Sequence, residues 1–99
     1  MLDINKTETE NKLIIKLAGR LDTNTAPELN KTIQKDLKDI NELIYDLSEL
    51  IYISSAGLRV ILLTQKIMSK QGSMKIINTQ DMVMEVFNAT GFTDIINIE

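Results

Sequence analysis

The first part of the chain alternates apolar and polar positions in the manner of β-strands. From Leu13 to Ala18 large aliphatic residues recur at every second position, which predicts a strand with one well-buried face. Leu2 and Ile4 show the same spacing and predict a shorter strand before it, with a turn near Glu10–Asn11. The segment Gly19–Asp22 is expected to lead out of the longer strand.

A helical spacing follows. The segment Thr25–Glu28 has a hydroxyl residue followed three positions later by a carboxylate, with a proline in what would be the first turn. This arrangement is typical of a capping box at a helix N-terminus. Apolar residues then recur every three or four positions and predict one buried helical face, formed by Leu29, Ile33, Leu37 and Ile40.

The middle of the chain predicts a buried strand and a second helix. Leu43–Leu47 is short and almost entirely apolar, as expected for a central strand that is covered on both faces. The residues Ser48–Ile53 are expected to be a connection. From Ala56 to about Lys70 the pattern is helical, and Gly72–Ser73 ends it. Another strand is predicted over Met74–Ile77.

The last predicted helix begins at Thr79 or Asp81 and ends at Gly91, and Asp94–Ile98 is expected to form an edge strand. The predicted order is therefore β-β-α-β-α-β-α-β in one domain that spans residues 1–99. Strands that alternate with helices indicate an α/β fold with a mixed, mainly parallel sheet, to which the first hairpin adds an antiparallel strand.

Composition excludes several classes of function. The 99 residues carry a formal charge of −3 and no basic block, which argues against a nucleic-acid partner. The chain contains no cysteine and no histidine, so it offers neither a usual zinc site nor a Ser-His-Asp triad. It contains no G-x-S-x-G elbow, P-loop or G-x-G-x-x-G motif. We therefore expect a non-enzymatic cytoplasmic protein without metal, cofactor or membrane span.

Two loops are expected to lie at one edge of the sheet. In open α/β sheets the functional loops follow the carboxyl ends of the parallel strands. One such loop contains Asp22, Thr23 and Asn24, and the other ends in Ser54–Gly57. If the two preceding strands are parallel, Asp22 and the serine pair lie in one neighbourhood.

The serine pair has two interpretations. In the first, Ser54 and Ser55 are purely structural, because serine is a preferred helix N-cap whose oxygen accepts a hydrogen bond from the first turn. In the second, the small residues Ala56 and Gly57 that follow leave the surface flat and let another segment approach, which suits the docking of a protein. The pattern alone leaves both interpretations open.

The chain resembles the STAS family, and more narrowly the bacterial anti-sigma factor antagonists. The resemblance is carried by GRLDTNTAPEL (Gly19–Leu29), LIYDLSELIYISSAGLRVIL (Leu43–Leu62) and ATGFTDIINI (Ala89–Ile98), which occur in the order found in that family. It implies a STAS-like fold over nearly the whole chain. It also implies a regulatory protein that binds other proteins.

The resemblance implies a phosphorylation site. In that family a serine two residues before a Gly-Leu pair accepts phosphate, which corresponds to Ser55, and the aspartate of the first loop corresponds to Asp22. Many members have an aspartate where this chain has Ser54 and a second serine where it has Ala56. Ser54 therefore stays open as a rival acceptor. Arg59 is either a solvated helix residue or a partial counter-charge for the phosphate.

The function implied is partner switching. The unmodified protein would bind an anti-sigma factor that is also an ATP-dependent serine kinase, and would thereby release a sigma factor. Phosphorylation would end the binding and a phosphatase would restore it. The partner surface would comprise Asp22, Thr23, Asn24, Ser54, Ser55, Ala56, Gly57 and Arg59. The alternative is a non-switching STAS scaffold in a sensory complex or a subunit of a lipid-transport system.

Overall fold

The computed structural model covers residues 1–99 and contains a five-stranded sheet with three α-helices. The strands lie side by side in chain order; β1 is antiparallel to β2 and the other pairings are parallel. The predicted element order and the mixed, mainly parallel sheet are confirmed. The elements are β1 Leu2–Thr9, β2 Lys12–Leu21, α1 Ala26–Asp36, β3 Glu42–Ile53, α2 Ser55–Ser69, β4 Ser73–Ile77, α3 Asp81–Thr90, the 3-10 turn Phe92–Asp94 and β5 Asn97–Ile98.

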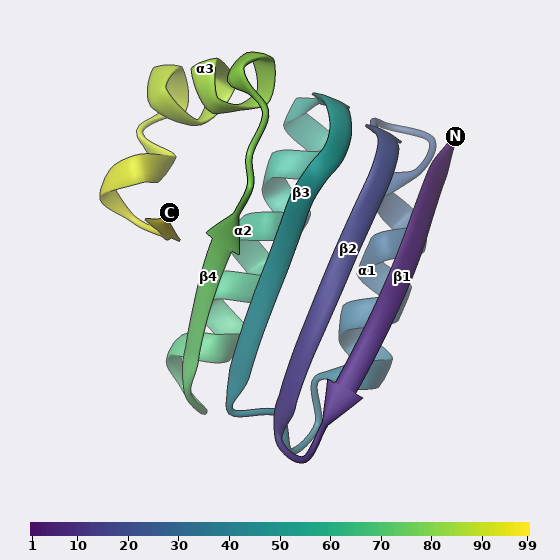
Figure 1. Ribbon diagram of the computed structural model, residues 1–99, viewed down its shortest axis with the longest axis vertical. Helices are drawn as coiled ribbons and strands as arrows, with labels where there is room; N and C mark the ends of the chain where they lie inside the picture. Colours follow the sequence, from purple (N-terminus) through teal and green to yellow (C-terminus); the bar gives the residue numbers. More distant parts are fainter.

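The helices are distributed unevenly around the sheet. In Figure 1, α1 and α2 lie together behind the sheet, whereas α3 lies beyond the end of β4 and packs beside the upper part of β3. The core lies between the sheet and the α1–α2 layer, because the alternate apolar positions of β2 and β3 face these helices. Its fully buried members include Leu13, Ile15, Leu17, Leu29, Ile33, Leu43, Tyr45, Leu47 and Ile61.

The two central strands are longer than predicted. The predicted ends at Ala18 and Leu47 are wrong, because β2 continues to Leu21 and β3 continues to Ile53. Their register shifts twice, and each time β3 holds one residue more than β2. These β-bulges shift the alternation of side chains, so the sequence of β3 no longer shows the two-residue period of a strand.

The carboxylate of Asp46 supports the first bulge. Its Oδ1 accepts a hydrogen bond from the backbone N–H of Ser48 at 3.0 Å and another from Asn78 Nδ2 at 3.4 Å. Gln80 Nε2 donates to the carbonyl of Ser48 at 2.7 Å. The N–H of Ser48 is thus bonded by Asp46 of β3 itself, and its carbonyl is bonded by Gln80 from the segment between β4 and α3.

The end of the chain differs from the expectation. The last helix, α3, begins at Asp81, one of the two predicted starts, and Gly91 follows its last residue as the predicted C-terminal glycine; the positive φ of 78° at Gly91 is the left-handed conformation typical of a helix C-terminus. The predicted strand Asp94–Ile98 is reduced to Asn97–Ile98, because Phe92–Asp94 forms a 3-10 turn. Phe92 stacks on Phe87 at 5.8 Å between ring centroids, and this contact keeps the turn against α3.

One buried polar pair joins α2 to the central strand. The Tyr45 hydroxyl lies 2.8 Å from Thr64 Oγ1, and both side chains are fully buried. Thr64 donates its single proton to the carbonyl of Val60 at 2.7 Å, so the tyrosine hydroxyl is the donor to Thr64. Burial raises the pKa of Tyr45 above its ordinary value, and the hydrogen bond to Thr64 lowers it by a smaller amount.

We predict unequal effects for the two members of this pair. Thr64→Val should lower the free energy of unfolding by about 1–3 kcal/mol, because it leaves a buried tyrosine hydroxyl without an acceptor. Tyr45→Phe should cost about 1 kcal/mol or less, because Thr64 keeps its bond to Val60. Urea denaturation of both variants measures the difference. The double variant should be more stable than Thr64→Val alone, and an equal or larger loss would contradict the assignment.

Candidate functional site

The loops after β2 and β3 meet at one edge of the sheet, which we call the carboxyl edge. Leu21 pairs with Ile53 at the last position of the two strands, and the backbone N–H of Ser54 donates to the carbonyl of Leu21 at 2.9 Å. Asp22 and Ser54 therefore follow directly from neighbouring strand ends. The structure brings the aspartate loop and the serine pair together, as the parallel pairing requires.

The loop after β2 is closed by hydrogen bonds between Asp22 and Thr25. Asp22 Oδ1 accepts from the backbone N–H groups of Asn24 and Thr25 at 3.0 and 3.1 Å. Thr25 Oγ1 accepts from the N–H of Asp22 at 2.8 Å and donates to the carbonyl of Arg20 at 2.9 Å. The predicted N-cap hydrogen bond of the capping box is wrong. The Thr25 hydroxyl bonds groups of the loop and makes no bond to the first turn of α1.

The Asp22 carboxylate is stabilised in its ionised form. Burial would raise its pKa, but the hydrogen bonds from Thr25 and Asn24 outweigh that effect and hold the pKa of Asp22 below its usual value. Its other oxygen lies 3.8 Å from Nε of Arg20, and the guanidinium of Arg20 lies 4.1 Å from the centre of the Tyr52 ring. Arg20 thus connects the aspartate loop to the last residues of β3.

The two serines differ in what their hydroxyls do. Ser54 is the N-cap of α2, and its Oγ accepts from the N–H of Gly57 at 3.4 Å. Ser55 is the first residue of the helix, is exposed and makes no side-chain hydrogen bond. The purely structural interpretation therefore fits Ser54, whereas the hydroxyl of Ser55 is open to an incoming reagent.

Gly57 allows the start of α2 to pack closely against the sheet. It is buried, and a Cβ at this position would lie 2.6 Å from Leu21 Cγ and 3.0 Å from Ile53 Cγ1. The glycine was expected to let another segment approach, but the groups that approach it are side chains of the sheet. It also lies inside the molecule and not on the flat outer surface expected of it.

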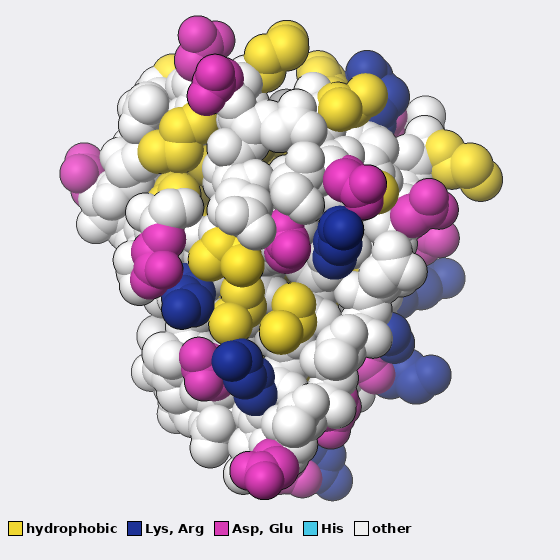
Figure 2. Space-filling view, in the orientation of Figure 1, with side chains coloured by type: hydrophobic (Ala, Val, Ile, Leu, Met, Phe, Trp, Pro, Cys, Tyr) yellow, Lys and Arg dark blue, Asp and Glu magenta, His cyan; other side chains and the backbone are white.

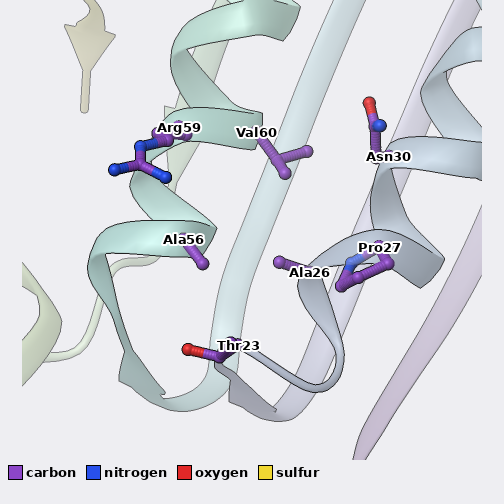
Figure 3. A pocket seen from close by; sticks show the side chains of 7 residues that line it. All are labelled: Thr23, Ala26, Pro27, Asn30, Ala56, Arg59 and Val60. Atoms are coloured by element: carbon purple, nitrogen blue, oxygen red, sulfur yellow. The ribbon is translucent and has the colours of Figure 1, made fainter.

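A hollow of about 260 Å³ separates the starts of α1 and α2. Figure 3 shows Ala56 and Val60 of α2 pointing toward the start of α1, while the Arg59 side chain extends to the other side of its helix. None of the four ion pairs of the molecule includes Arg59. Ser55 and Arg59 are four residues apart on α2 and so share one helical face. The lining residues are Thr23, Ala26, Pro27, Asn30, Ala56, Arg59 and Val60.

The carboxylates of the molecule do not converge. No group of three or more aspartate or glutamate side chains is placed to hold a metal ion. Of the helices, none is both long and apolar enough to cross a membrane. The polar side chains at the carboxyl edge include the unbonded hydroxyl of Ser55, the hydrogen-bonded carboxylate of Asp22 and the guanidinium groups of Arg20 and Arg59.

Comparison with known proteins identifies the family. A model of the STAS domain matches residues 3–99. The chain belongs to the STAS domain family. The anti-sigma-B factor antagonist of Bacillus subtilis (strain 168) is 31% identical over 98 residues, which cover 98% of this chain and 90% of that protein.

Solved structures of other proteins share the fold. An anti-sigma factor antagonist from Mycobacterium paratuberculosis superposes with a TM-score of 0.90 at 19% identity, covering 99% of this chain and 85% of its own. The Bacillus cell fate determinant SpoIIAA in its phosphorylated form superposes with a TM-score of 0.77 at 17% identity, covering 98% and 91%. The STAS-like architecture expected from the sequence is thus confirmed.

The sequence analysis missed a second surface of this STAS domain beside the carboxyl edge. Ile51 and Tyr52, which were expected in a connection, lie at the end of β3 and form a groove with α3, to which Met82 contributes. The one sign of this groove in the sequence is the pair Met82 and Met84, because these two residues cannot both face the core together with Val83. Met82 is exposed in the structure and Met84 is half-buried.

We predict that the two serines contribute differently to stability. Ser54→Ala should lower the free energy of unfolding by about 1 kcal/mol through loss of the N-cap. Ser55→Ala should change it by less than about 0.5 kcal/mol, because the side chain is exposed and unbonded. Chemical denaturation of the two variants under identical conditions checks this. A larger loss for Ser55→Ala would mean that the capping roles are reversed.

We predict that Asp22 and Asp46 titrate below the ordinary aspartate value of 3.8. Because the folded-state pKa is the lower one, their hydrogen bonds stabilise the fold above pH 3.8, and this contribution disappears as the pH falls through the folded-state pKa. NMR titration of the carboxyl carbons measures both midpoints. A midpoint at or above 3.8 for Asp22 would contradict the hydrogen bonding of its loop.

Proposed function

We propose that this STAS domain is a cytoplasmic anti-sigma factor antagonist that acts by partner switching, with Ser55 as its phosphorylated residue. The unphosphorylated form binds an ATP-binding anti-sigma factor with serine kinase activity, so that a sigma factor is released. Phosphorylation of Ser55 ends the binding and a phosphatase restores it. The similarity to anti-sigma factor antagonists supports the general role. The exposed hydroxyl of Ser55, which makes no hydrogen bond, supports its assignment as the phosphorylated residue.

The position of Ser55 supports its role as acceptor. Its hydroxyl is exposed, makes no hydrogen bond and lies at the first residue of α2, whereas the hydroxyl of Ser54 is used as the N-cap. In the transfer, Ser55 Oγ forms a bond to the γ-phosphorus of ATP as the bond to the leaving ADP breaks. The serine proton passes to a base of the kinase, because the Ser55 hydroxyl makes no hydrogen bond to a carboxylate of this chain.

A phosphate at this position is compatible with the fold. It adds a charge of about −1.5 to −2, and the free N–H groups and the dipole of the first helical turn favour negative charge there. Arg59 lies one turn further on the same face and provides a further counter-charge. The modification therefore acts on the surface that the partner meets, through its bulk and through repulsion of acidic groups on the partner.

The neighbouring residues form the rest of the proposed docking surface. Thr23 and Asn24 are exposed in the loop after β2, whose strand end pairs with the end of β3, and Asp22 is held in its ionised form by the same loop. Ala56 and Arg59 line the hollow between α1 and α2. Gly57 takes part indirectly, because it allows α2 to begin directly on the ends of β2 and β3.

We predict that Ser55→Asp keeps the fold and loses the partner. The added charge is favourable at a helix start, so the circular dichroism spectrum and the melting temperature should match the wild type. Affinity capture from the native cell lysate, followed by mass spectrometry, should retain an ATP-binding anti-sigma factor on the wild type only.

The matched control is Ser73→Asp, which places the same charge on an exposed serine at the start of β4, at the opposite edge of the sheet. It should capture the same protein as the wild type. If the wild type and Ser55→Asp retain the same partners, Ser55 is not a switch. The scaffold or transport-subunit alternative would then be favoured.

A further inference from the structure

A second apolar surface adjoins the carboxyl edge. The end of β3 and one side of α3 enclose a groove of about 230 Å³, whose apolar lining is Ile51, Tyr52, Ile53, Met82, Val83 and Val86. Beyond Asp46, β3 has no strand on the side of β4, because the pairing with β4 ends at Ile77. The groove lies where α3 replaces that strand. Figure 1 shows α3 beside the upper end of β3.

The groove holds most of the exposed large apolar side chains of the molecule. Met82 is 71% exposed, Ile51 52% and Tyr52 39%, and only Met1 and Ile95 are comparable elsewhere. Figure 2 shows apolar side chains at the upper end of the molecule, with acidic side chains at the upper left and a basic one at the upper right beside them. Adjoining exposed apolar side chains are costly to leave in water and mark protein docking surfaces.

The groove is continuous with the surface around Ser55. Its β3 wall ends at Ile53, and the next two residues are Ser54 and Ser55. Arg20 lies over the Tyr52 ring at 4.1 Å and pairs with Asp22 at 3.8 Å, so one side chain touches both the groove and the aspartate loop. A protein that covers Ser55 and the aspartate loop therefore also reaches the groove.

We propose that the groove is an anchor site for the same partner that docks over Ser55, and that it receives an apolar side chain flanked by a basic one. This inference rests on the proposed function for the identity of the partner. The basic residue is inferred from the acidic residues at the groove, which attract a positive charge on the partner. Glu85 lines the groove, Asp81 lies one helical turn before Glu85 in α3, and neither carboxylate is in an ion pair. The two acidic groups also disfavour an anionic membrane surface as the occupant.

Site-specific photo-crosslinking in the native cells tests the groove with the partner that the cell itself supplies. The photoreactive residue p-benzoylphenylalanine replaces Met82 in the groove, Asn24 in the aspartate loop or Ile95 as the control, in three separate full-length variants. All three positions are exposed, and Ile95 is an apolar side chain outside the groove. We expect positions 82 and 24 to form an adduct with the same protein and position 95 to form none with it.

Several outcomes would overturn the proposal. These are no adduct at position 82, an adduct there with a second copy of this chain or with lipid, or different proteins at positions 82 and 24. The crosslinking test of the groove can succeed or fail independently of the test of the phosphate switch. If positions 82 and 24 capture one protein that Ser55→Asp also retains, the groove assignment stands and the phosphate switch fails.

The energetic contribution is measured with the purified adduct partner. By isothermal titration calorimetry, Met82→Asp should weaken binding at least tenfold, because it places a charge in an apolar anchor site. Ile95→Asp makes the same chemical change at the control position and should bind as the wild type does. Equal affinities for Met82→Asp and the wild type would show that the groove is not an anchor, even where Ser55→Asp still loses the partner.

Discussion

The packing of the first turn of α2 on the ends of β2 and β3 is the contact on which the candidate site depends. Gly57 has no side chain, so the helix can begin within van der Waals reach of Leu21 and Ile53. The N–H of Ser54 bonds the carbonyl of Leu21, and Ser54 Oγ accepts from the N–H of Gly57. These contacts fix the direction of the helix start. Ser55 consequently projects from a support of fixed direction, which presents its hydroxyl in one orientation.

Much of the fold could be predicted because its elements follow simple periods. The alternation in β2 and the helical spacing in α1 are local properties, and both elements form where they were expected, although β2 continues to Leu21 and α1 ends at Asp36, before the predicted Leu37 and Ile40. The length of β3 could not be predicted in this way. Its second half contains two bulges, and its exposed residues Ile51 and Tyr52 have no local period. The register there is set by pairing with β2, which is a long-range interaction that the sequence of β3 alone does not encode.

In the candidate site, too, some features could be predicted from the sequence and others could not. Parallel strands bring their carboxyl ends to one edge, so the proximity of Asp22 to the serine pair followed from topology. The use of Thr25 by the loop did not, because a hydroxyl before a helix serves equally as a cap or as a loop acceptor. The groove beside α3 was also out of reach. Whether Met82 is buried depends on where α3 lies relative to β3, and that is settled only in three dimensions.

In the proposed switch, a phosphate on Ser55 changes binding without changing the fold, because the charge would be placed where the helix favours it. The free energy of the switch must then come from the interface. A like-charge contact in a docked complex costs several kcal/mol, which is enough to separate a bound from an unbound state at ordinary concentrations. Such a contact discriminates between the two forms, but it supplies no affinity of its own. In the proposed complex, the apolar groove whose wall ends two residues before Ser55 would supply affinity that is the same in both forms. Under this proposal, affinity and discrimination come from different surfaces, so one modification would act as a switch on a domain that stays folded.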